Sequence, residues 1–226
     1  MLARPASPPT PRVVALVLAA GRARRFGADK RQACLPDGRS LLQAVLQTQL
    51  QACGDVRVLL REGDDWGQAL CAQWGVAWQV VPDADQGMGH TLAAGLRALV
   101  AEESADPGGD LGASRCASPS QHPVASPGVH RFDAALIALA DMPAVQPDTV
   151  RALIEAFHRD GRPAWPWHAD RPGHPRLLPR SSWPALLDLQ GDEGARQRLD
   201  WSLATPVDVP DAGILVDIDT PGDLGG

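Results

Sequence analysis

Residues 13–30 read Val13-Val-Ala-Leu-Val-Leu-Ala-Ala-Gly-Arg-Ala-Arg-Arg-Phe-Gly-Ala-Asp-Lys30. The first six residues are apolar and rich in valine, which is typical of a buried strand. Gly21 and Gly27 then allow the backbone to approach an anion closely and to adopt positive φ. Five of the chain's 21 lysines and arginines lie between Arg22 and Arg31, although the net charge of the chain is -6. A buried strand therefore runs into a basic loop that suits a triphosphate, because arginine and lysine side chains both bind phosphate.

The glycine spacing of this loop excludes two common phosphate-binding motifs. Lys30 does not follow a glycine, so G-x-x-x-x-G-K-[ST] is absent, and no G-x-G-x-x-G is present either. The pattern L-A-A-G-x-x-x-R-x-G-x-x-K, which begins at Leu18, instead resembles the signature loop of nucleotidyltransferases with a MobA-like NTP transferase domain. Among these it is most similar to the molybdenum cofactor cytidylyltransferases. A solvated basic turn after a strand is the alternative interpretation.

This resemblance implies which loop residues bind the nucleotide and which take part in catalysis. Arg25 and Lys30 would be catalytic, since their charges would neutralise the leaving pyrophosphate. Leu-Ala-Ala-Gly, rather than Leu-Ala-Gly-Gly, is similar to the cytidylyl group more than to the guanylyl group, and that distinction depends on Ala20 alone. The nucleotide-binding residues of the loop are then Leu18, Ala19, Ala20, Gly21, Arg25 and Lys30.

Length, charge and cysteine content limit the classes of protein to consider. The chain has 226 residues, 44% of them hydrophobic, which suits a single domain over 12–226 after a proline-rich, disordered lead over 1–11. With 27 acidic against 21 basic residues, nucleic acid is not an expected partner. No apolar run approaches the ~20 residues of a membrane span, and the run at 13–20 is too short for a signal peptide. The four cysteines are scattered, which is typical of reduced cytoplasmic thiols.

Hydrophobic patterning alternates between strands and helices along the chain. Ser40 is a helix cap, Leu41 to Leu50 have the spacing of one apolar helix face, and a short final helix is expected from Pro221. Such alternation predicts an α/β fold with a mostly parallel sheet and helices on both faces. The resemblance implies a Rossmann-like, three-layer α/β/α nucleotidyltransferase fold with a mixed central sheet. The expected strands are 13–18, 56–60, 76–81 and 134–140, and the expected helices are 41–50, 64–74, 91–100 and one that contains 150–157.

Residues 102–131 interrupt this alternation. They are rich in alanine, serine, proline, glycine and aspartate and show no periodicity. This composition predicts a disordered insertion within the domain. A lid over the site is the alternative interpretation of the same segment.

Aspartates follow two segments that end near the expected site. Asp141 comes directly after the apolar run 134–140, and the carboxyl end of a buried strand opens into the crevice where α/β sheets bind ligands. Asp217 and Asp219 flank Ile218 in an extended segment, which places both carboxylates on one face. A hard cation such as Mg²⁺ binds one or two carboxylates together with phosphate oxygens. Capping of turns or helices by these aspartates is the alternative interpretation.

Both acidic segments resemble metal-binding motifs of the same family. Ala140-Asp-Met-Pro143 is similar to G-D-x-P, with alanine in place of glycine, and the resemblance makes Asp141 a catalytic residue that binds the metal. Asp217-Ile-Asp-Thr-Pro221 is similar to D-I-D-T-P, in which one aspartate completes the metal site. We expect Asp219 to be that Mg²⁺ ligand, with Asp217 as the alternative.

A pair of glycines at 87 and 89 precedes the expected helix at 91–100. Glycines in this arrangement would expose backbone N–H groups to a base edge or a phosphate. The segment resembles the G-M-G-x-S-L segment of the cytidylyltransferase group, which lies against the nucleoside. An ordinary turn at the entry of a helix is the alternative interpretation. The nucleotide-binding residues that the resemblance implies here are Gly87, Met88, Gly89 and Thr91.

Pro172-Gly-His-Pro175 resembles the G-H-P turn in the half of the family's fold that receives the second substrate. The resemblance implies that His174 is a contact in the substrate pocket, not a general base. Trp165, Trp167 and Trp183 surround this turn in the sequence. Their flat rings suit either stacking on a pterin or packing in the core.

The segment Gly191-Asp-Glu-Gly-Ala-Arg196 resembles the G-D-x-G-A-R segment of the same group. Arg196 then has two candidate roles. It would either meet a phosphate or pair with Asp192 on a helix.

All of these motifs occur in the sequence order of the family, which favours one function over the others. The resemblance implies a Mg²⁺-dependent nucleotidyltransferase that transfers CMP from CTP, or a nucleotide from another nucleoside triphosphate, to a molybdopterin-type acceptor. A molybdenum hydroxylase or its accessory protein would be the partner. The alternatives are a guanylyltransferase, a sugar- or alcohol-phosphate nucleotidyltransferase of the same fold, and a carrier or chaperone that binds molybdenum cofactor without turnover.

Overall fold

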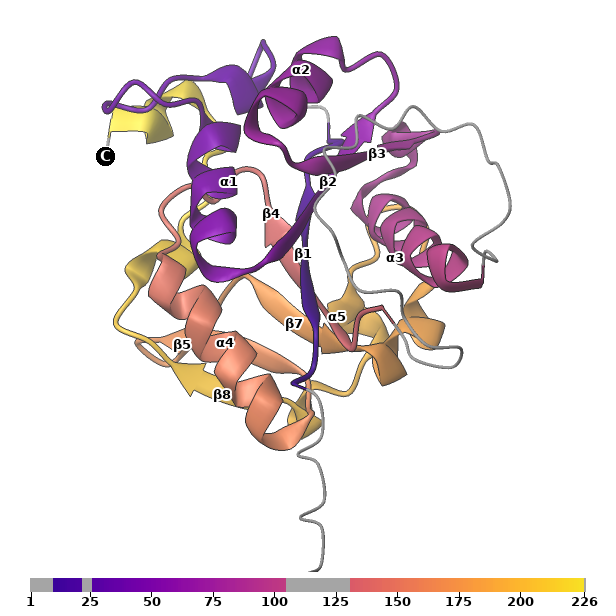
Figure 1. Cartoon of the computed structure of the whole chain (residues 1–226). Coiled ribbons are helices and arrows are strands. Elements are labelled where there is room, and N and C mark those ends of the chain that lie inside the picture. The colour runs from indigo at the N-terminus through magenta and orange to yellow at the C-terminus, as the bar shows by residue number, and fades with distance from the viewer. Residues whose placement is uncertain (1–9, 22–25, 105–130, 226) are drawn as a thin grey trace, which may run out of the picture.

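The computed structural model describes residues 10–21, 26–104 and 131–225 (Figure 1). Within them the chain forms an eight-stranded sheet in the order β3-β2-β1-β4-β7-β5-β6, with β8 paired to β5. The expected insertion falls mainly on residues 105–130, and most of the expected lead on residues 1–9, so both lie outside the described residues. The strands are β1 Val13–Leu18, β2 Asp55–Arg61, β3 Ala77–Val81, β4 Ala134–Leu139, β5 Ala164–His168, β6 Arg171–Pro172, β7 Arg176–Pro179 and β8 Thr205–Asp208.

The sheet is parallel on one side and mixed on the other. β1 pairs in parallel with both β2 and β4, so that Val17 lies opposite Val58 and Ala138. β7 then runs antiparallel to β4 and to β5, while β8 is parallel to β5. The mixed, mostly parallel α/β sheet expected from the sequence is therefore confirmed. Its parallel strands bring the carboxyl ends of β1 and β4 to the same edge.

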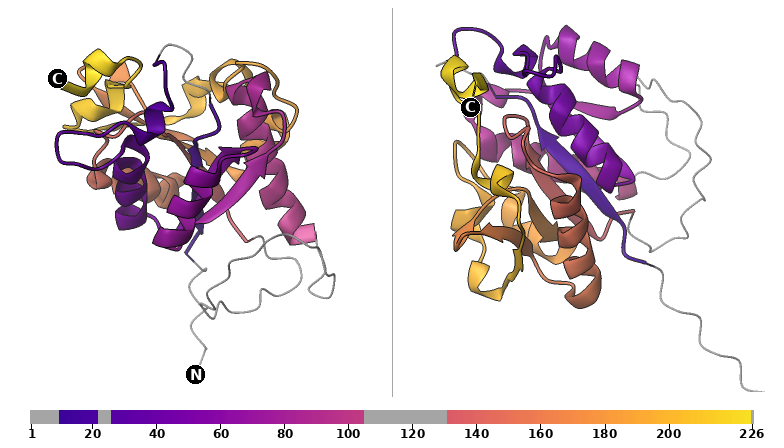
Figure 2. Two further views of the ribbon diagram at one scale, coloured as in Figure 1. Left: turned by 90° about the horizontal axis from the view of Figure 1, so that it is seen from above. Right: turned by 90° about the vertical axis from the view of Figure 1, so that its left-hand side faces the viewer.

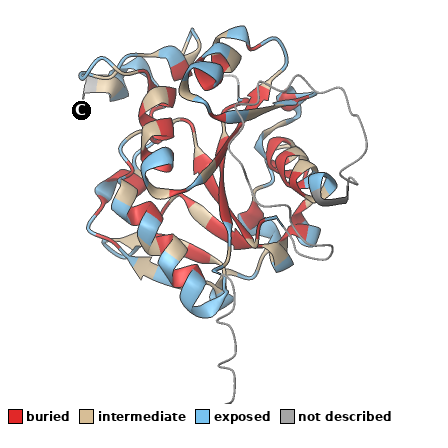
Figure 3. Ribbon diagram, in the orientation of Figure 1, coloured by how far each residue is buried: buried red, intermediate tan, exposed pale blue. Residues whose placement is uncertain are grey.

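Helices cover both faces of this sheet and bury its central strands (Figures 2 and 3). One hydrophobic core lies between the sheet and helices α1, α2 and α4. A second core lies on the other face, beneath α3, the 3₁₀ helix η3 and α5. The α-helices are α1 Leu41–Ala52, α2 Asp65–Trp74, α3 Met88–Ser104, α4 Pro147–Asp160 and α5 Ala195–Arg198. The 3₁₀ helices are η1 Lys30–Gln32, η2 Ala84–Gln86, η3 Arg180–Leu186, η4 Trp201–Leu203, η5 Ala212–Leu215 and η6 Pro221–Gly225.

Local sequence signals explain most of the helix boundaries. Ser40 caps α1 through a capping box, in which its hydroxyl accepts from the Gln43 amide and the Gln43 side chain accepts from Ser40 N–H. Pro147 opens α4, where a missing N–H costs nothing. Within the described residues, no helix is long and apolar enough to cross a membrane.

Three details differ from the sequence-based expectations. Leu50 does not belong to the buried face of α1, because its side chain is exposed near the end of the helix. α3 extends beyond both expected ends, from Met88 to Ser104. The helix expected from Pro221 is a 3₁₀ turn, in which the Asp223 carboxylate accepts hydrogen bonds from the backbone N–H groups of Asp219 and Thr220.

Candidate active site

Lys30 brings together the two aspartates that the sequence singled out. Its Nζ lies 2.8 Å from Asp141 Oδ2 and 3.1 Å from Asp219 Oδ1. It also donates to the Ile218 carbonyl oxygen at 3.1 Å. The three side chains come from η1, from the turn after β4 and from the C-terminal segment, so Lys30 is 111 residues from Asp141 and 189 residues from Asp219 in the chain. We call Lys30, Asp141 and Asp219 the Lys30 cluster.

Backbone hydrogen bonds hold the Lys30 cluster at the carboxyl edge of the sheet. Ala140 N–H donates to the Leu18 carbonyl oxygen at 3.2 Å, which joins the turn after β4 to the end of β1. Ile218 N–H donates to the Asp141 carbonyl oxygen at 2.9 Å, which ties the C-terminal segment to the same turn. Buried Ile218 anchors that segment, and the exposed Asp217 and Asp219 flank it. Lys30 contacts the carboxylate of Asp219 and not that of Asp217.

The electrostatics of the Lys30 cluster suit a cation-binding site. Burial works against the charged form of Lys30, but Asp141 and then Asp219 outweigh it and raise the pKa of the ammonium. Asp141 Oδ1 is buried and has no hydrogen-bond partner. Two carboxylates, one with an unclaimed oxygen, fit a hard divalent ion that takes its remaining ligands from phosphate and water. In the described ranges, no group of three or more acidic, histidine or cysteine side chains is arranged so that it could hold a metal ion by itself.

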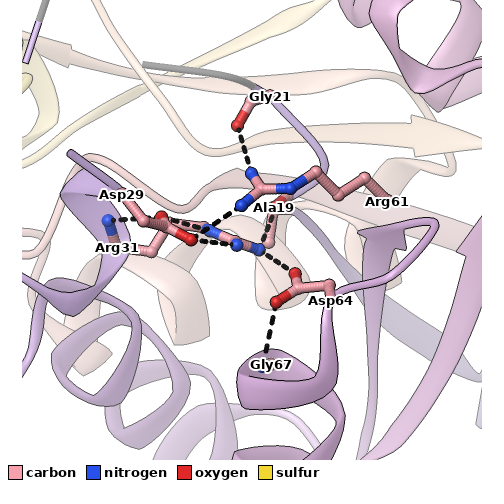
Figure 4. Close-up of polar contacts among 7 residues, drawn as sticks. All are labelled: Ala19, Gly21, Asp29, Arg31, Arg61, Asp64 and Gly67. Atoms are coloured by element: carbon pink, nitrogen blue, oxygen red, sulfur yellow. Dashed lines mark hydrogen bonds and ion pairs between the residues drawn. The ribbon is translucent and has the colours of Figure 1, made fainter. Parts of the chain in front are cut away.

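Arg31, the next residue along, belongs to a different network (Figure 4). Its guanidinium is 3% exposed and forms ion pairs with Asp29 and Asp64. It also donates to the Ala19 carbonyl oxygen at 2.7 Å, at the start of the basic loop. Asp64 Oδ1 in turn accepts from Gly67 N–H at 3.0 Å, in the first turn of α2. Arg31 is therefore a structural anchor, and its inclusion among the phosphate-facing charges of the loop was wrong.

Arg61 completes this network at the end of β2. It donates to Asp29 Oδ2 at 2.9 Å and to the Gly21 carbonyl oxygen at 3.3 Å. Burial opposes the charge of Asp29, but the arginines Arg31 and Arg61 dominate and lower its pKa to about 2. We call Asp29, Arg31, Arg61 and Asp64 the Arg31 network. The sequence marked Asp64 only as the start of the expected helix 64–74, and no pattern pointed to Asp29 or Arg61.

The start of the basic loop is fixed by these contacts. Ala19 and Ala20 are buried, and Ala19 N–H donates to the Leu59 carbonyl oxygen at 3.0 Å. Gly21 is exposed, so the chain leaves the sheet at this residue. Arg25, the other expected catalytic cation, lies outside the described residues.

The glycines at 87 and 89 serve close packing, which differs from the expectation that they expose free N–H groups. An added Cβ at Gly87 would lie 2.2 Å from the Gly191 carbonyl oxygen, and one at Gly89 would lie 2.2 Å from the Glu193 carbonyl oxygen. Gly89 N–H donates to Gly191, and Gly87 N–H to Ala84. The two motifs centred on 87–89 and 191–196 therefore pack together.

Thr91 and Met88, in the motif centred on 87–89, differ in their exposure. The Thr91 hydroxyl donates to the Gly87 carbonyl oxygen at 3.2 Å and is buried inside the first turn of α3. Met88 is exposed. Of this expected nucleotide-binding set, Met88 is therefore the side chain that is open to a ligand.

His174 binds the C-terminal segment through its backbone. Its backbone N–H donates to the Ile214 carbonyl oxygen at 3.1 Å, just before the residues that carry Asp219. Burial, and then the nearby charge of Arg176, lower the pKa of the His174 ring to about 4, so the ring is neutral at pH 7. None of the hydrogen bonds of the Lys30 cluster involves His174, and its role as a contact in the substrate pocket stays a prediction. Trp183 is fully buried and donates to the Leu178 carbonyl oxygen, so it packs in the core.

The sequence model of the MobA-like NTP transferase domain matches residues 15–207, a range that includes Lys30 and Asp141 and ends before Asp219. No curated protein matches the chain significantly.

Solved structures share the fold over nearly the whole chain. Rv0371c from Mycobacterium tuberculosis H37Rv is 26% identical, with a TM-score of 0.64 over 94% of this chain and 95% of that one. A structure of Rv0371C from the same organism in complex with manganese is 23% identical, with a TM-score of 0.60 over 94% and 95%. Molybdopterin-guanine dinucleotide biosynthesis protein A from Archaeoglobus fulgidus is 19% identical, with a TM-score of 0.59 over 93% and 94%.

Proposed function

The chain belongs to the MobA-like NTP transferase domain family, and from this premise we propose that it transfers CMP from CTP to a molybdopterin-type molybdenum cofactor and releases pyrophosphate. The observation that carries the proposal is the contact of Lys30 with both Asp141 and Asp219. It joins a basic loop residue to two carboxylates at the edge where α/β sheets bind ligands. A nucleotidyltransferase needs those two charge types side by side, one for the metal and one for the phosphates.

Asp141 and Asp219 are the residues that would hold Mg²⁺. The unpartnered Asp141 Oδ1 and the 52% exposed side chain of Asp219 leave oxygens available to it. When bound, Mg²⁺ supplies charge neutralisation and alignment at the phosphate oxygens. Support for a divalent ion also comes from the related Mycobacterium tuberculosis protein that was solved with manganese.

In the proposed reaction a phosphate oxygen of the acceptor attacks the α-phosphorus of CTP. The bond between the α-phosphorus and the bridging oxygen breaks, and the electron pair leaves with pyrophosphate. No general base is required, because a phosphate monoester with a second pKa of about 6 is already ionised at neutral pH. Lys30 and Arg25 neutralise the leaving pyrophosphate, so catalysis is mainly positioning and electrostatics. The Arg31 network takes no part in this chemistry except to fix Ala19 and Gly21.

Two features support the choice of substrates. Ala20 gives the loop the Leu-Ala-Ala-Gly start that resembles the cytidylyl group. The fold is shared with an Archaeoglobus fulgidus protein whose name includes molybdopterin-guanine dinucleotide biosynthesis. A molybdenum hydroxylase or its accessory protein would receive the product.

Pyrophosphate release tests this proposal directly. It is measured with CTP and with GTP, each with Mg²⁺, in the presence and absence of molybdenum cofactor. We expect release with CTP that depends on the cofactor. Release with GTP alone would make the protein a guanylyltransferase, and release only with a sugar or alcohol phosphate would change the acceptor. No release with any pair, from a folded protein that binds the cofactor, would favour a carrier.

A further inference from the structure

Arg176 lies in an aromatic environment at the start of β7. Its Cζ is 4.9 Å from the centre of the Trp201 ring and 5.5 Å from that of Trp165. These two indoles stack on each other, with centroids 4.9 Å apart and planes inclined by 26°. A guanidinium held by ring faces keeps its N–H edges available for other partners. Among the described residues these edges make one weak hydrogen bond, which Nε donates to the Gly173 carbonyl oxygen at 3.5 Å.

No acidic side chain in the described part of the chain pairs with Arg176. Burial and then the positive charge of Arg196 lower its pKa to about 10. Arg196 forms no ion pair with Asp192 or with any other described acid. Arg198, two residues further on, is by contrast paired with both Asp188 and Glu193. A half-buried cation that is repelled by another cation is costly unless an anion joins them.

Two buried polar atoms nearby also lack partners. Trp167 Nε1 has no hydrogen-bond acceptor, and its ring packs edge-on against Trp165 at 5.6 Å. His174 Nδ1 has no partner either, and the charge of Arg176 acts on its ring. Buried polar atoms usually have hydrogen-bond partners in folded proteins, so two without partners around one unpaired cation favour a ligand-binding site here.

Arg176 and the tryptophans around it are separate from the Lys30 cluster. Neither Asp141 nor Asp219 is among the charges that act on Arg176. In the sheet, Arg176 of β7 lies opposite Ile137 of β4. Ile137 precedes Asp141 by four residues, which span at most about 14 Å of chain. Arg196 follows the segment that packs against Gly89 at the start of α3. The two charge centres are therefore separate, and the four-residue step from Ile137 to Asp141 limits how far apart their two strand positions lie.

We propose that Arg176, with Arg196, binds a second anionic group of the acceptor, distinct from the phosphate that attacks the nucleotide. The acceptor is then an elongated molecule with a phosphate at one end and a further anion near a planar ring system, which lies against Trp165 and Trp201. This inference rests on the proposed function, because it takes the ligand to be the acceptor of that reaction. It adds a specificity rule, because acceptors without the second anion bind weakly.

A binding experiment on the full chain tests the site without any turnover. The probe is 1-naphthyl phosphate, and the readout is quenching of tryptophan fluorescence. We expect saturable quenching in the wild type and at least tenfold weaker binding in Arg176→Met, because charge-assisted hydrogen bonds are lost. Arg198→Met is the matched control, since it removes a cation that is already neutralised, and its affinity should equal that of the wild type. Lys30→Ala should also leave probe affinity unchanged, which separates this site from the triphosphate loop.

Other outcomes overturn the inference. Equal probe affinity in Arg176→Met and Arg198→Met would do so, and so would the absence of quenching in the wild type. If the methionine variant does not melt cooperatively, Arg176→Lys replaces it and should weaken binding at least threefold.

In the turnover assay, Arg176→Met should raise the KM for the acceptor at least tenfold and leave the KM for CTP unchanged. A wild type without turnover would contradict the proposed function and leave the probe result standing.

Discussion

Lys30 and Arg31 are neighbours in the chain, and each contacts two aspartates, yet the two clusters are built differently. Arg31 is 3% exposed, and its network also binds backbone groups of the basic loop and of α2. Lys30 joins a carboxylate with an unpartnered buried oxygen to a second carboxylate that is half exposed. The difference teaches that the residue types alone do not identify the site. Polar atoms without partners identify the site, because a ligand can bind only where such atoms remain available.

Arg176 extends this comparison to a cation that pairs with no acid among the described residues. The three basic residues therefore form a series, in which Arg31 pairs with largely buried acids, Lys30 with more exposed acids, and Arg176 with no described acid. We assign structure to the first, metal and phosphate chemistry to the second, and acceptor binding to the third. Each assignment predicts a different consequence of mutation.

Replacing Arg31 should have the largest effect, and that effect should be on stability. Arg31→Met leaves Asp64 buried without a counter-charge, and breaking a buried ion pair in this way costs about 3–5 kcal/mol of the free energy of unfolding. Urea denaturation measures the change. Arg39→Met is the matched control, because Arg39 pairs with Asp37 at the same two-residue spacing on the surface. It should unfold as the wild type does, and equal losses in the two variants would contradict the comparison.

Replacing Lys30 should have the opposite consequence, a loss of activity with little change in stability. Lys30→Ala should lower the turnover number about 100-fold, the usual loss when one preorganised charge is removed from a reacting phosphate. Its thermal midpoint with Mg²⁺ present should stay close to that of the wild type. Steady-state pyrophosphate release and a thermal melt give both values. Wild-type turnover in this variant would end the assignment of Lys30.

His174 should make stability depend on pH in a defined window. Its pKa is about 4 when folded and 6.5 in its ordinary range, so protonation favours the unfolded chain. Stability should therefore fall as pH drops from 6.5 to 4, by about 3 kcal/mol from this ring. Urea denaturation at several pH values compares the wild type with His174→Gln. Parallel pH profiles for the two proteins would contradict a buried, neutral His174.

Asp29 should give a smaller effect at lower pH. Its folded pKa of about 2 lies below the ordinary 3.8, so its ion pairs stabilise the fold above pH 4. That contribution, about 1 kcal/mol after allowance for solvent screening, is lost as pH falls from 3.8 towards 2. Asp29→Asn should lack this pH dependence. A constant difference in unfolding free energy from pH 5 to pH 2.5 would argue against the assigned role.

The sequence was sufficient to predict the parallel half of the sheet and the ends of its central strands, whereas no pattern pointed to the strands β5 to β8. Valine-rich runs and capping residues are local signals, and β1, α1 and α4 follow them closely. The sequence also singled out Lys30, Asp141 and Asp219, which the structure then joins. Their meeting follows from parallel strands, whose carboxyl ends share one edge.

The sequence could not separate the roles of basic residues in one loop. Arg31 differs from Lys30 only through Asp64 and Arg61, whose contacts span more than thirty residues. The close packing of Gly89 on Glu193 is equally non-local. The same holds for Arg176, because Trp201 reaches it from η4. Partners that lie far apart in the chain leave no periodic signal.

The most direct test of the account is Mg²⁺-dependent pyrophosphate release from CTP by Asp219→Asn and by Asp217→Asn, each compared with the wild type. These two aspartates lie on either side of Ile218, are both exposed, and differ in that Asp219 contacts Lys30. The account predicts that Asp219→Asn lowers turnover by about 100-fold or more, while Asp217→Asn keeps turnover near that of the wild type. Loss of turnover in Asp217→Asn with full activity in Asp219→Asn would contradict the claim that the Lys30 cluster is the active site.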